Sequence, residues 1–114
     1  MTFSQLAIAD TFEIEHEITI KNMVIFQKNM DKFLLQSKKF MILNLQKVKY
    51  LNNSALKIIA SAAITAKKND KELVIVGIRP PIDEIFEIVK FSNFMELFAT
   101  YDEAIAYFAR KMHD

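Results

Sequence analysis

Several residue types that define common functional sites are missing or rare in this chain of 114 residues, which has no cysteine, no tryptophan and a single glycine, Gly77. Without cysteine there can be no disulfide and no thiolate metal ligand, and this composition is typical of a reducing compartment. One glycine cannot build the glycine-rich loops that hold phosphates in nucleoside-triphosphate and dinucleotide sites. The sequence therefore excludes both of these nucleotide-binding fingerprints.

The overall charge and the hydropathy do not point to a nucleic acid or a membrane. The formal net charge is +1, which provides no overall field to attract a polyanion. No uninterrupted apolar run approaches the roughly 20 residues of a membrane-spanning helix. The first residues, MTFSQLAIADTFEI, lack the basic segment of a signal peptide. We therefore expect a cytoplasmic protein with no membrane span and no nucleic-acid partner.

The chain is equally poor in candidates for catalysis and metal binding. Its only histidines are His16, expected to be a half-buried strand residue, and His113. Two histidines without cysteine do not make up the usual ligand sets of zinc. Ser54, His16 and an acid have the side chains of a hydrolytic triad, but no nucleophile-elbow sequence surrounds a serine. We expect no metal, no cofactor and no enzymatic activity.

Apolar side chains, by contrast, make up 52% of the residues, with 25% charged. These values are typical of a globular protein, and the length suits one domain over residues 1–114. Apolar periods of two, and of three and four, predict strands and helices respectively. The expected strands are 3–9, 12–19, 40–46, 72–77 and 95–99, and the expected helices are 20–39, 53–70, 81–91 and 101–114.

The same periodicity predicts which side of each element faces the core. The two opening strands flank Asp10-Thr11, and Glu13, Glu15 and Glu17 share one strand face that should meet water. The first helix should bury a stripe made of Ile20, Met23, Val24, Met30, Phe33 and Leu34. Thr100 and Glu103 have the spacing of a capping box before the last helix.

Strands that alternate with helices predict a mainly parallel sheet joined by right-handed crossovers. The two opening strands should add a hairpin at its edge. The expected fold is therefore a small single-domain α/β protein with about four helices.

The turn between the third strand and the second helix is unusually polar. It reads VKYLNNSALK over 48–57, and Asn53 or Ser54 is expected to cap the helix. Asparagine and serine are ordinary turn residues, so capping alone would account for the run. Phosphorylation of Ser54, or a contact surface that includes these residues, are the alternatives.

The element order and this turn resemble the STAS domain, the fold of bacterial anti-sigma factor antagonists. In that family the turn follows the pattern V-x-F-I-D-S-[ST]-G-L, and the matching residues here are VKYLNNSAL, 48–56. Further matches are LVIVG (73–77) with the family's fourth strand, FATYDEA (98–104) with its closing motif, and HEIT (16–19) with its early G-E-L-D. The resemblance covers most of the chain and implies the STAS fold.

The resemblance also implies that the turn and the next helix bind a protein, and that the serine after the turn aspartate is phosphorylated. Here Asn52 replaces that aspartate, Asn53 replaces the serine and Ala55 replaces the turn glycine. Ser54 retains a hydroxyl one residue later and is the phosphoacceptor candidate. The partner-binding candidates are Thr19, which stands where the early motif has aspartate, Asn52, Asn53, Ser54 and Lys57.

Three functions remain open on this evidence. The resemblance implies a regulatory domain that docks a kinase-like anti-sigma factor through residues 50–57 and the following helix. A second hypothesis is a non-phosphorylated STAS scaffold or an accessory subunit of a transporter or signalling assembly. A third is a small nucleotide-binding protein or enzyme with an anion site at the turn, against which the single glycine argues. The aromatic residues between 86 and 98 are expected to pack in the core, with an exposed partner-binding patch as the alternative.

Overall fold

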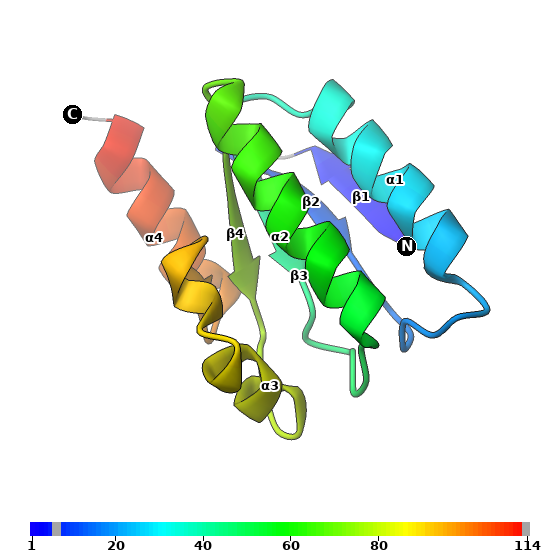
Figure 1. Cartoon of the computed structure of the whole chain (residues 1–114). Coiled ribbons are helices and arrows are strands. Elements are labelled where there is room, and N and C mark those ends of the chain that lie inside the picture. The colour runs from blue at the N-terminus through cyan, green and yellow to red at the C-terminus, as the bar shows by residue number, and fades with distance from the viewer. Residues whose placement is uncertain (6–7, 113–114) are drawn as a thin grey trace.

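The computed structural model describes residues 1–5 and 8–112, which form a five-stranded sheet with helices on both faces (Figure 1). The elements are β1 (Thr2–Gln5), β2 (Asp10–Glu13), α1 (Met23–Gln36), β3 (Phe40–Asn44), α2 (Asn53–Lys68), β4 (Glu72–Val76), α3 (Ile82–Ile88), a 3₁₀ turn (Phe91–Asn93), β5 (Leu97–Phe98) and α4 (Tyr101–Met112).

The strands lie in the order β1-β2-β3-β4-β5, which is their order in the sequence. β1 pairs with β2 antiparallel, and β2, β3, β4 and β5 pair in parallel. This confirms the predicted α/β fold with a mainly parallel sheet and an edge hairpin.

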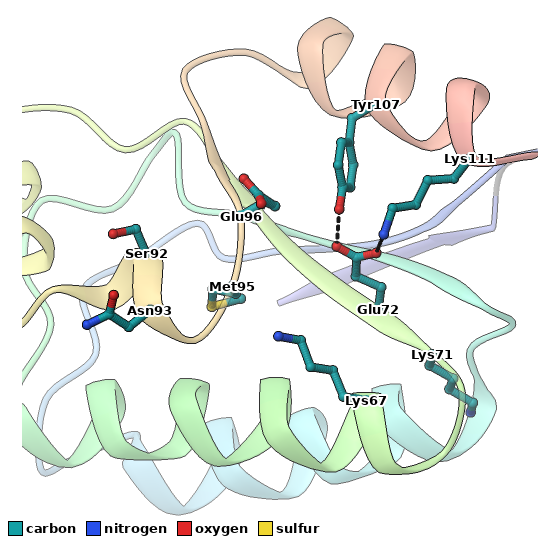
Figure 2. Close-up of a pocket in the computed structure, with 9 residues that line it drawn as sticks. All are labelled: Lys67, Lys71, Glu72, Ser92, Asn93, Met95, Glu96, Tyr107 and Lys111. Atoms are coloured by element: carbon teal, nitrogen blue, oxygen red, sulfur yellow. Dashed lines mark hydrogen bonds and ion pairs between the residues drawn. The ribbon is translucent and has the colours of Figure 1, made fainter. Parts of the chain in front are cut away.

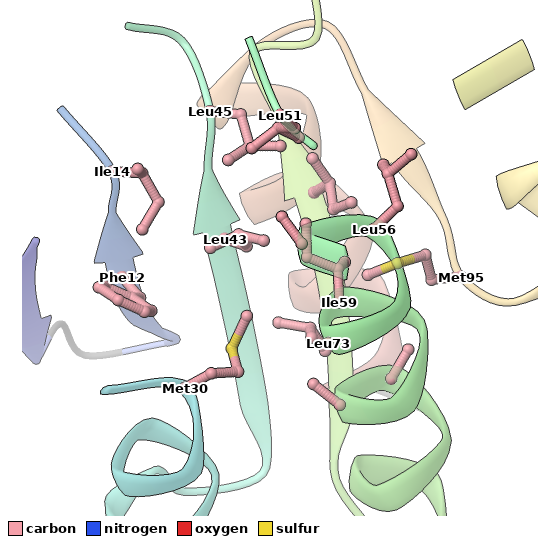
Figure 3. Close-up of a cluster of buried hydrophobic side chains, with 14 of the residues drawn as sticks. Phe12, Ile14, Met30, Leu43, Leu45, Leu51, Leu56, Ile59, Leu73 and Met95 are labelled. Atoms are coloured by element: carbon pink, nitrogen blue, oxygen red, sulfur yellow. The ribbon is translucent and has the colours of Figure 1, made fainter. Parts of the chain in front are cut away.

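Alternating side chains of the central strands divide the core into two layers. Met41 and Leu43 of β3 lie in the larger layer, with residues of α1 and α2. Phe40 and Ile42 point to the other face and pack with Phe108 of α4. Both layers are apolar, so β3 and β4 read as nearly continuous apolar runs, as expected of strands covered on two faces. Figure 3 shows Leu43 and Leu73 meeting Ile59 of α2.

The opening strands differ from the prediction. Asp10 and Thr11, expected between the strands, are buried and begin β2. The backbone N–H of Lys38 donates to Asp10 Oδ2 at 2.7 Å, whereas Asp10 Oδ1 is buried and has no hydrogen-bond partner among the described residues. β2 ends at Glu13 rather than residue 19, and the first predicted strand includes residues 6–7, which lie outside the described chain.

The early end of β2 also changes the surroundings of His16. Strand alternation does not continue through residues 14–19, and His16 is exposed rather than half-buried as predicted. Ile14 and Ile18 remain in the core, because this segment stays beside the sheet through the isolated parallel bridge between Ile18 and Leu51. The outward position expected for Glu17 is confirmed, while Glu13 and Glu15 are half-buried.

The first helix is shorter than predicted, and its buried stripe agrees with the prediction only in part. It begins at Met23, and Ile20 and Val24 are 82% and 63% exposed. The buried face consists of Met30 and Phe33, as predicted, together with Phe26, which was not predicted, and the three are spaced by four and three residues. Several apolar stripes fit the 3.6-residue period in this sequence, and the position of the helix on the sheet selects one of them.

The last elements follow the expected order with shorter bounds. β5 comprises Leu97–Phe98 rather than 95–99, and α3 begins at Ile82 after Pro81. Thr100 and Glu103 form the predicted capping box: Glu103 N–H donates to Thr100 Oγ1 at 3.2 Å, and Thr100 N–H donates to Glu103 Oε1 at 3.0 Å.

The only glycine occupies a position that no other residue could take without strain. Gly77 follows β4 with φ of +80°, a left-handed value that L side chains rarely adopt. A Cβ there would lie 2.8 Å from the backbone of Gln46. The close approach of the segments after β3 and β4 therefore requires glycine.

Candidate functional site

The polar turn lies beyond the carboxyl end of β3, the end of a parallel sheet where ligand and partner sites usually form. Val48 and Leu51 are buried and anchor the turn to the core. The N–H of Gln46 donates to Asn44 Oδ1 at 2.9 Å, and the N–H of Val48 donates to the carbonyl of Leu45 at 3.0 Å. The turn is therefore fixed by apolar contacts with the core and by hydrogen bonds between its own residues.

Asn52 is the N-cap of α2. Its backbone is extended, and its Oδ1 accepts from the backbone N–H of Ala55 at 2.8 Å. The predicted cap, Asn53 or Ser54, is therefore wrong by one or two residues: Asn53 is already the first residue of the helix. The cap falls on Asn52 because Leu51 is fixed in the core and the helix begins two residues later.

This cap leaves the next two polar side chains available. Asn53 and Ser54 are both exposed, and neither side chain makes a hydrogen bond to another described residue. Ser54 is the second residue of α2, near the positive end of the helix dipole. Lys57 follows Asn53 at a spacing of four, so both lie on one side of the helix.

Thr19 is brought to the same place by a separate segment. Ile18 and Leu51 form an isolated parallel bridge, in which Ile18 N–H donates to the carbonyl of Tyr50 at 3.0 Å and Asn52 N–H donates to that of Ile18 at 3.1 Å. Thr19 therefore lies beside Asn52. Its Oγ1 accepts from the N–H of Lys21 at 3.2 Å, so the hydroxyl has a local role in ordering the loop.

An open apolar hollow adjoins the start of α2. It has a volume of about 530 Å³ and is lined by Asn53, Leu56, Lys57, Ala60, Val89, Phe91 and Phe94. Val89 and Phe94 are 46% and 38% exposed, whereas Phe91 is buried and holds Phe94 edge-on with ring centres 5.8 Å apart. The prediction of core packing for the 86–98 aromatics is thus correct for Phe86 and Phe91, and Phe94 lies on the surface.

Val89 and Phe94 were not among the predicted site residues. The sequence shows that aromatic residues are concentrated between 86 and 98, but it does not indicate that this segment lies against α2. The structure thus adds an apolar wall to the polar residues of the turn.

Electrostatically, this surface is uncharged or basic. The first turn of α2 contains no acidic residue, and Lys57 borders the hollow. Glu13, at the end of β2, lies 3.5 Å from the amine of Lys47 and 3.4 Å from the amide of Asn44. Within residues 1–5 and 8–112, no group of three or more histidine or acidic side chains could hold a metal ion.

Solved structures of similar shape support the fold. An anti-sigma factor antagonist from Mycobacterium paratuberculosis superposes with a TM-score of 0.87, at 16% identity over 95% of this chain and 92% of that one. A sulfate transporter family protein from Wolinella succinogenes gives 0.80, at 14% identity over 96% and 91%. The phosphorylated form of the Bacillus cell fate determinant SpoIIAA gives 0.69, at 12% identity over 93% and 96%. At these identities the similarity shows the fold alone.

The sequence comparisons assign the family. No curated protein matches the sequence significantly. The family model described as the STAS domain matches residues 8–104, which include every strand from β2 to β5, the turn and α2. This chain belongs to the STAS domain family.

Proposed function

We propose that the chain is a protein-binding regulatory domain, and that its partner docks on residues 50–57, the start of α2 and the adjoining hollow. The observation that carries this proposal is the junction of exposed polar side chains, Asn53, Ser54 and Lys57, with the apolar hollow walled by Val89 and Phe94. Protein interfaces commonly combine an apolar centre with a polar rim. The similarity to anti-sigma factor antagonists favours an anti-sigma factor with a kinase-like fold as the partner class.

Ser54 is the proposed switch residue. Its hydroxyl is exposed and not used as a cap, so a kinase could reach it. A phosphate would bring a charge of about −1.5 to −2 to the first turn of α2. The backbone N–H groups and the helix dipole would stabilise that charge within this chain. A partner surface that packs against the uncharged Ser54 side chain would then face a charged phosphate and would be displaced.

The second candidate function is a constitutive STAS scaffold or an accessory subunit of a transporter or signalling assembly. It is favoured by Asn53 at the position where the family pattern has serine, and by the similarity to the sulfate transporter family protein. In this case the same surface binds its partner without modification. The two proposals therefore differ in the effect of a negative charge at Ser54. Neither assigns a chemical step to the chain.

The test is a quantitative binding experiment with the kinase-like anti-sigma protein encoded by the same genome. Phe94→Asp places a charge in the hollow and should abolish binding, whereas Ile64→Asp, a change at a 43% exposed residue of α2 outside the hollow, should leave it unchanged. Loss of binding with Ser54→Asp but not with Ser54→Ala supports the switch. Unchanged binding with Ser54→Asp supports the scaffold, and equal binding by the Phe94→Asp variant refutes the docking surface.

A further inference from the structure

Although the net charge is only +1, one end of the molecule is rich in basic side chains. The last turns of α1, α2 and α4 lie at one end of the sheet, the end at which β3 and β4 begin (Figure 1). We call this the basic end. It is defined by the basic side chains in those last turns and in the segments that lead into β3 and β4: Lys38, Lys39, Lys67, Lys68, Lys71, Arg110 and Lys111.

Few of these charges are neutralised within the described chain. The carboxylates of the described residues at this end are Asp70, Glu72, Glu96 and the buried Asp10, which accepts from the backbone N–H of Lys38. Glu72 accepts from the amine of Lys111 and from the hydroxyl of Tyr107. Of the seven cations, Lys111 alone forms an ion pair with a described residue. Among the described residues, the basic end therefore carries more positive than negative side chains.

Helix dipoles account for only part of this distribution. Lys67 and Lys68 end α2, and Arg110 and Lys111 end α4, where cations are favourable. Lys38 and Lys39 lie outside the helices, between α1 and β3. Lys71 lies between α2 and β4, and its amine donates to the carbonyl of Leu34 at 2.6 Å, which joins the end of α1 to that of α2.

Two large aliphatic side chains are exposed among these cations. Leu35 near the end of α1 is 83% exposed, and Met112 at the end of α4 is 58% exposed. Aliphatic side chains surrounded by lysine and arginine are the combination that binds at the headgroup boundary of an anionic membrane. Single-stranded nucleic acids stack on exposed aromatic rings, and few are found in the described part of this end. Phe3 is 37% exposed but stacks on Phe33, Phe40 is 7% exposed, and Tyr107 is half-buried against Glu72.

A hollow between the last turns of α2 and α4 offers space beside one of the unpaired cations. It has a volume of about 350 Å³ and is lined mostly by polar side chains. Figure 2 shows Lys67 reaching from α2 into this hollow, with Glu72 held by Tyr107 and Lys111 on the side of α4. The amine of Lys67 is thus placed to meet a headgroup phosphate.

We propose that the basic end binds the surface of an anionic lipid bilayer, with its cations on the headgroups and with Leu35 and Met112 at the headgroup boundary. This inference goes beyond the proposed function, because the 50–57 turn lies at the carboxyl end of β3, opposite the basic end. A protein partner and a bilayer can therefore be bound at the same time.

Co-sedimentation of the full chain with large unilamellar vesicles tests the proposal. The protein should sediment with vesicles that contain about 30% phosphatidylglycerol in phosphatidylcholine and not with pure phosphatidylcholine. Raising the salt from about 0.1 M to about 0.5 M should reduce binding, since exposed charges are screened. Leu35→Gln/Met112→Gln should weaken binding without a change in charge.

The charge variants supply a matched control. The triple change Lys38→Gln, Lys39→Gln and Lys68→Gln should lower the partition coefficient at least about tenfold. The triple change Lys21→Gln, Lys28→Gln and Lys49→Gln removes the same charge from exposed positions outside the basic end and should have a much smaller effect. Circular dichroism and the urea midpoint establish that each variant is folded.

Three results would overturn the proposal: no binding to the anionic vesicles, equal binding to both kinds of vesicle, or equal losses from the two triple changes. Tighter binding to a DNA or RNA oligonucleotide than to anionic vesicles at the same salt would assign the surface to nucleic acid instead. The anti-sigma binding experiment uses the opposite end, so a failure there leaves this result unaffected.

Discussion

The side chain of Asn52 accepts the backbone N–H of Ala55 at 2.8 Å, and this one hydrogen bond separates the structural role of the turn from its functional one. Asn52 caps α2, so the side chains of Asn53 and Ser54 are not needed for the helix to begin. The three consecutive polar residues Asn52, Asn53 and Ser54 thus have two roles. The first caps the helix, and the next two are exposed at the proposed docking surface.

The first prediction concerns this division. Asn52→Ala should lower the free energy of unfolding by about 1 kcal/mol, the usual cost of losing an N-cap. Ser54→Ala, two residues later, should change it by less than about 0.5 kcal/mol, as is usual for surface changes. Urea denaturation of the two variants measures both values. A larger loss for Ser54→Ala than for Asn52→Ala would contradict the assignment of the cap.

The second prediction concerns the only glycine. Gly77→Ala should destabilise the protein by more than about 1 kcal/mol, because φ at this residue is +80° and the new Cβ would meet the backbone of Gln46. Lys90 also has a positive φ, of 53°, and is exposed. Lys90→Gly relieves left-handed strain and should instead raise the unfolding free energy slightly. Unfolding curves for the pair should therefore shift in opposite directions, and a tolerated alanine at 77 would mean that residue 77 does not approach the backbone of Gln46 as closely as described.

The third prediction compares two phenylalanines. Phe108 is fully buried and stacks on Phe40 with ring centres 4.5 Å apart, in the layer between the sheet and α4. Phe108→Ala should cost about 3–5 kcal/mol, through lost burial and the cavity that remains. Phe94→Ala removes a partly exposed ring and should cost under about 1 kcal/mol while weakening partner binding. Thermal unfolding gives the stabilities, and equal losses at both sites would show that Phe94 belongs to the core.

The fourth prediction concerns alkaline pH. Burial, together with its hydrogen bond to Glu72 at 2.5 Å, raises the pKa of Tyr107 above its ordinary value of 10.0, and the same carboxylate raises the pKa of Lys111. The Tyr107 hydroxyl and the Lys111 amine therefore hold their protons more tightly in the folded state than in the unfolded state. Their contribution to stability is therefore complete below pH 10 and is lost as the pH rises through the folded pKa values.

The unfolding free energy should consequently fall as the pH rises above about 10. Tyr107→Phe should lower stability at pH 7 by about 0.5–1.5 kcal/mol through the lost hydrogen bond, and should make the alkaline decline shallower. Urea midpoints measured between pH 7 and pH 11 for both proteins test this. Parallel curves across that range would show that Tyr107 does not titrate differently in the folded state.

Much of the architecture could be predicted because it depends on local pattern. The largely apolar stretches 40–46 and 72–77 predict central strands, since a parallel strand covered on both faces is apolar along most of its length. Thr100 and Glu103 predict the start of α4 because a capping box is formed by residues three apart, within one turn. The turn at 48–57 keeps the apolar positions of the STAS pattern but not its aspartate, serine and glycine, and the family assignment over residues 8–104 confirms the resemblance of the whole chain.

Other features required contacts between distant segments. The spacing of apolar residues in 20–39 permits several helical stripes, and only the placement of α1 on the sheet selects Phe26 over Val24. β2 ends at Glu13 although the apolar alternation of the sequence runs on to Ile18, because strand length depends on the backbone partners that β3 offers.

The sequence by itself determined the fold class, the element order and the polar turn, because hydrophobic periodicity and turn chemistry act over a few residues. Only the tertiary structure decided that Val89 and Phe94 border the start of α2, that Thr19 lies beside Asn52, and that seven basic residues from three parts of the chain gather at one end. The physical reason is that parallel crossovers bring together residues far apart in the sequence, and no local pattern records which of them will meet.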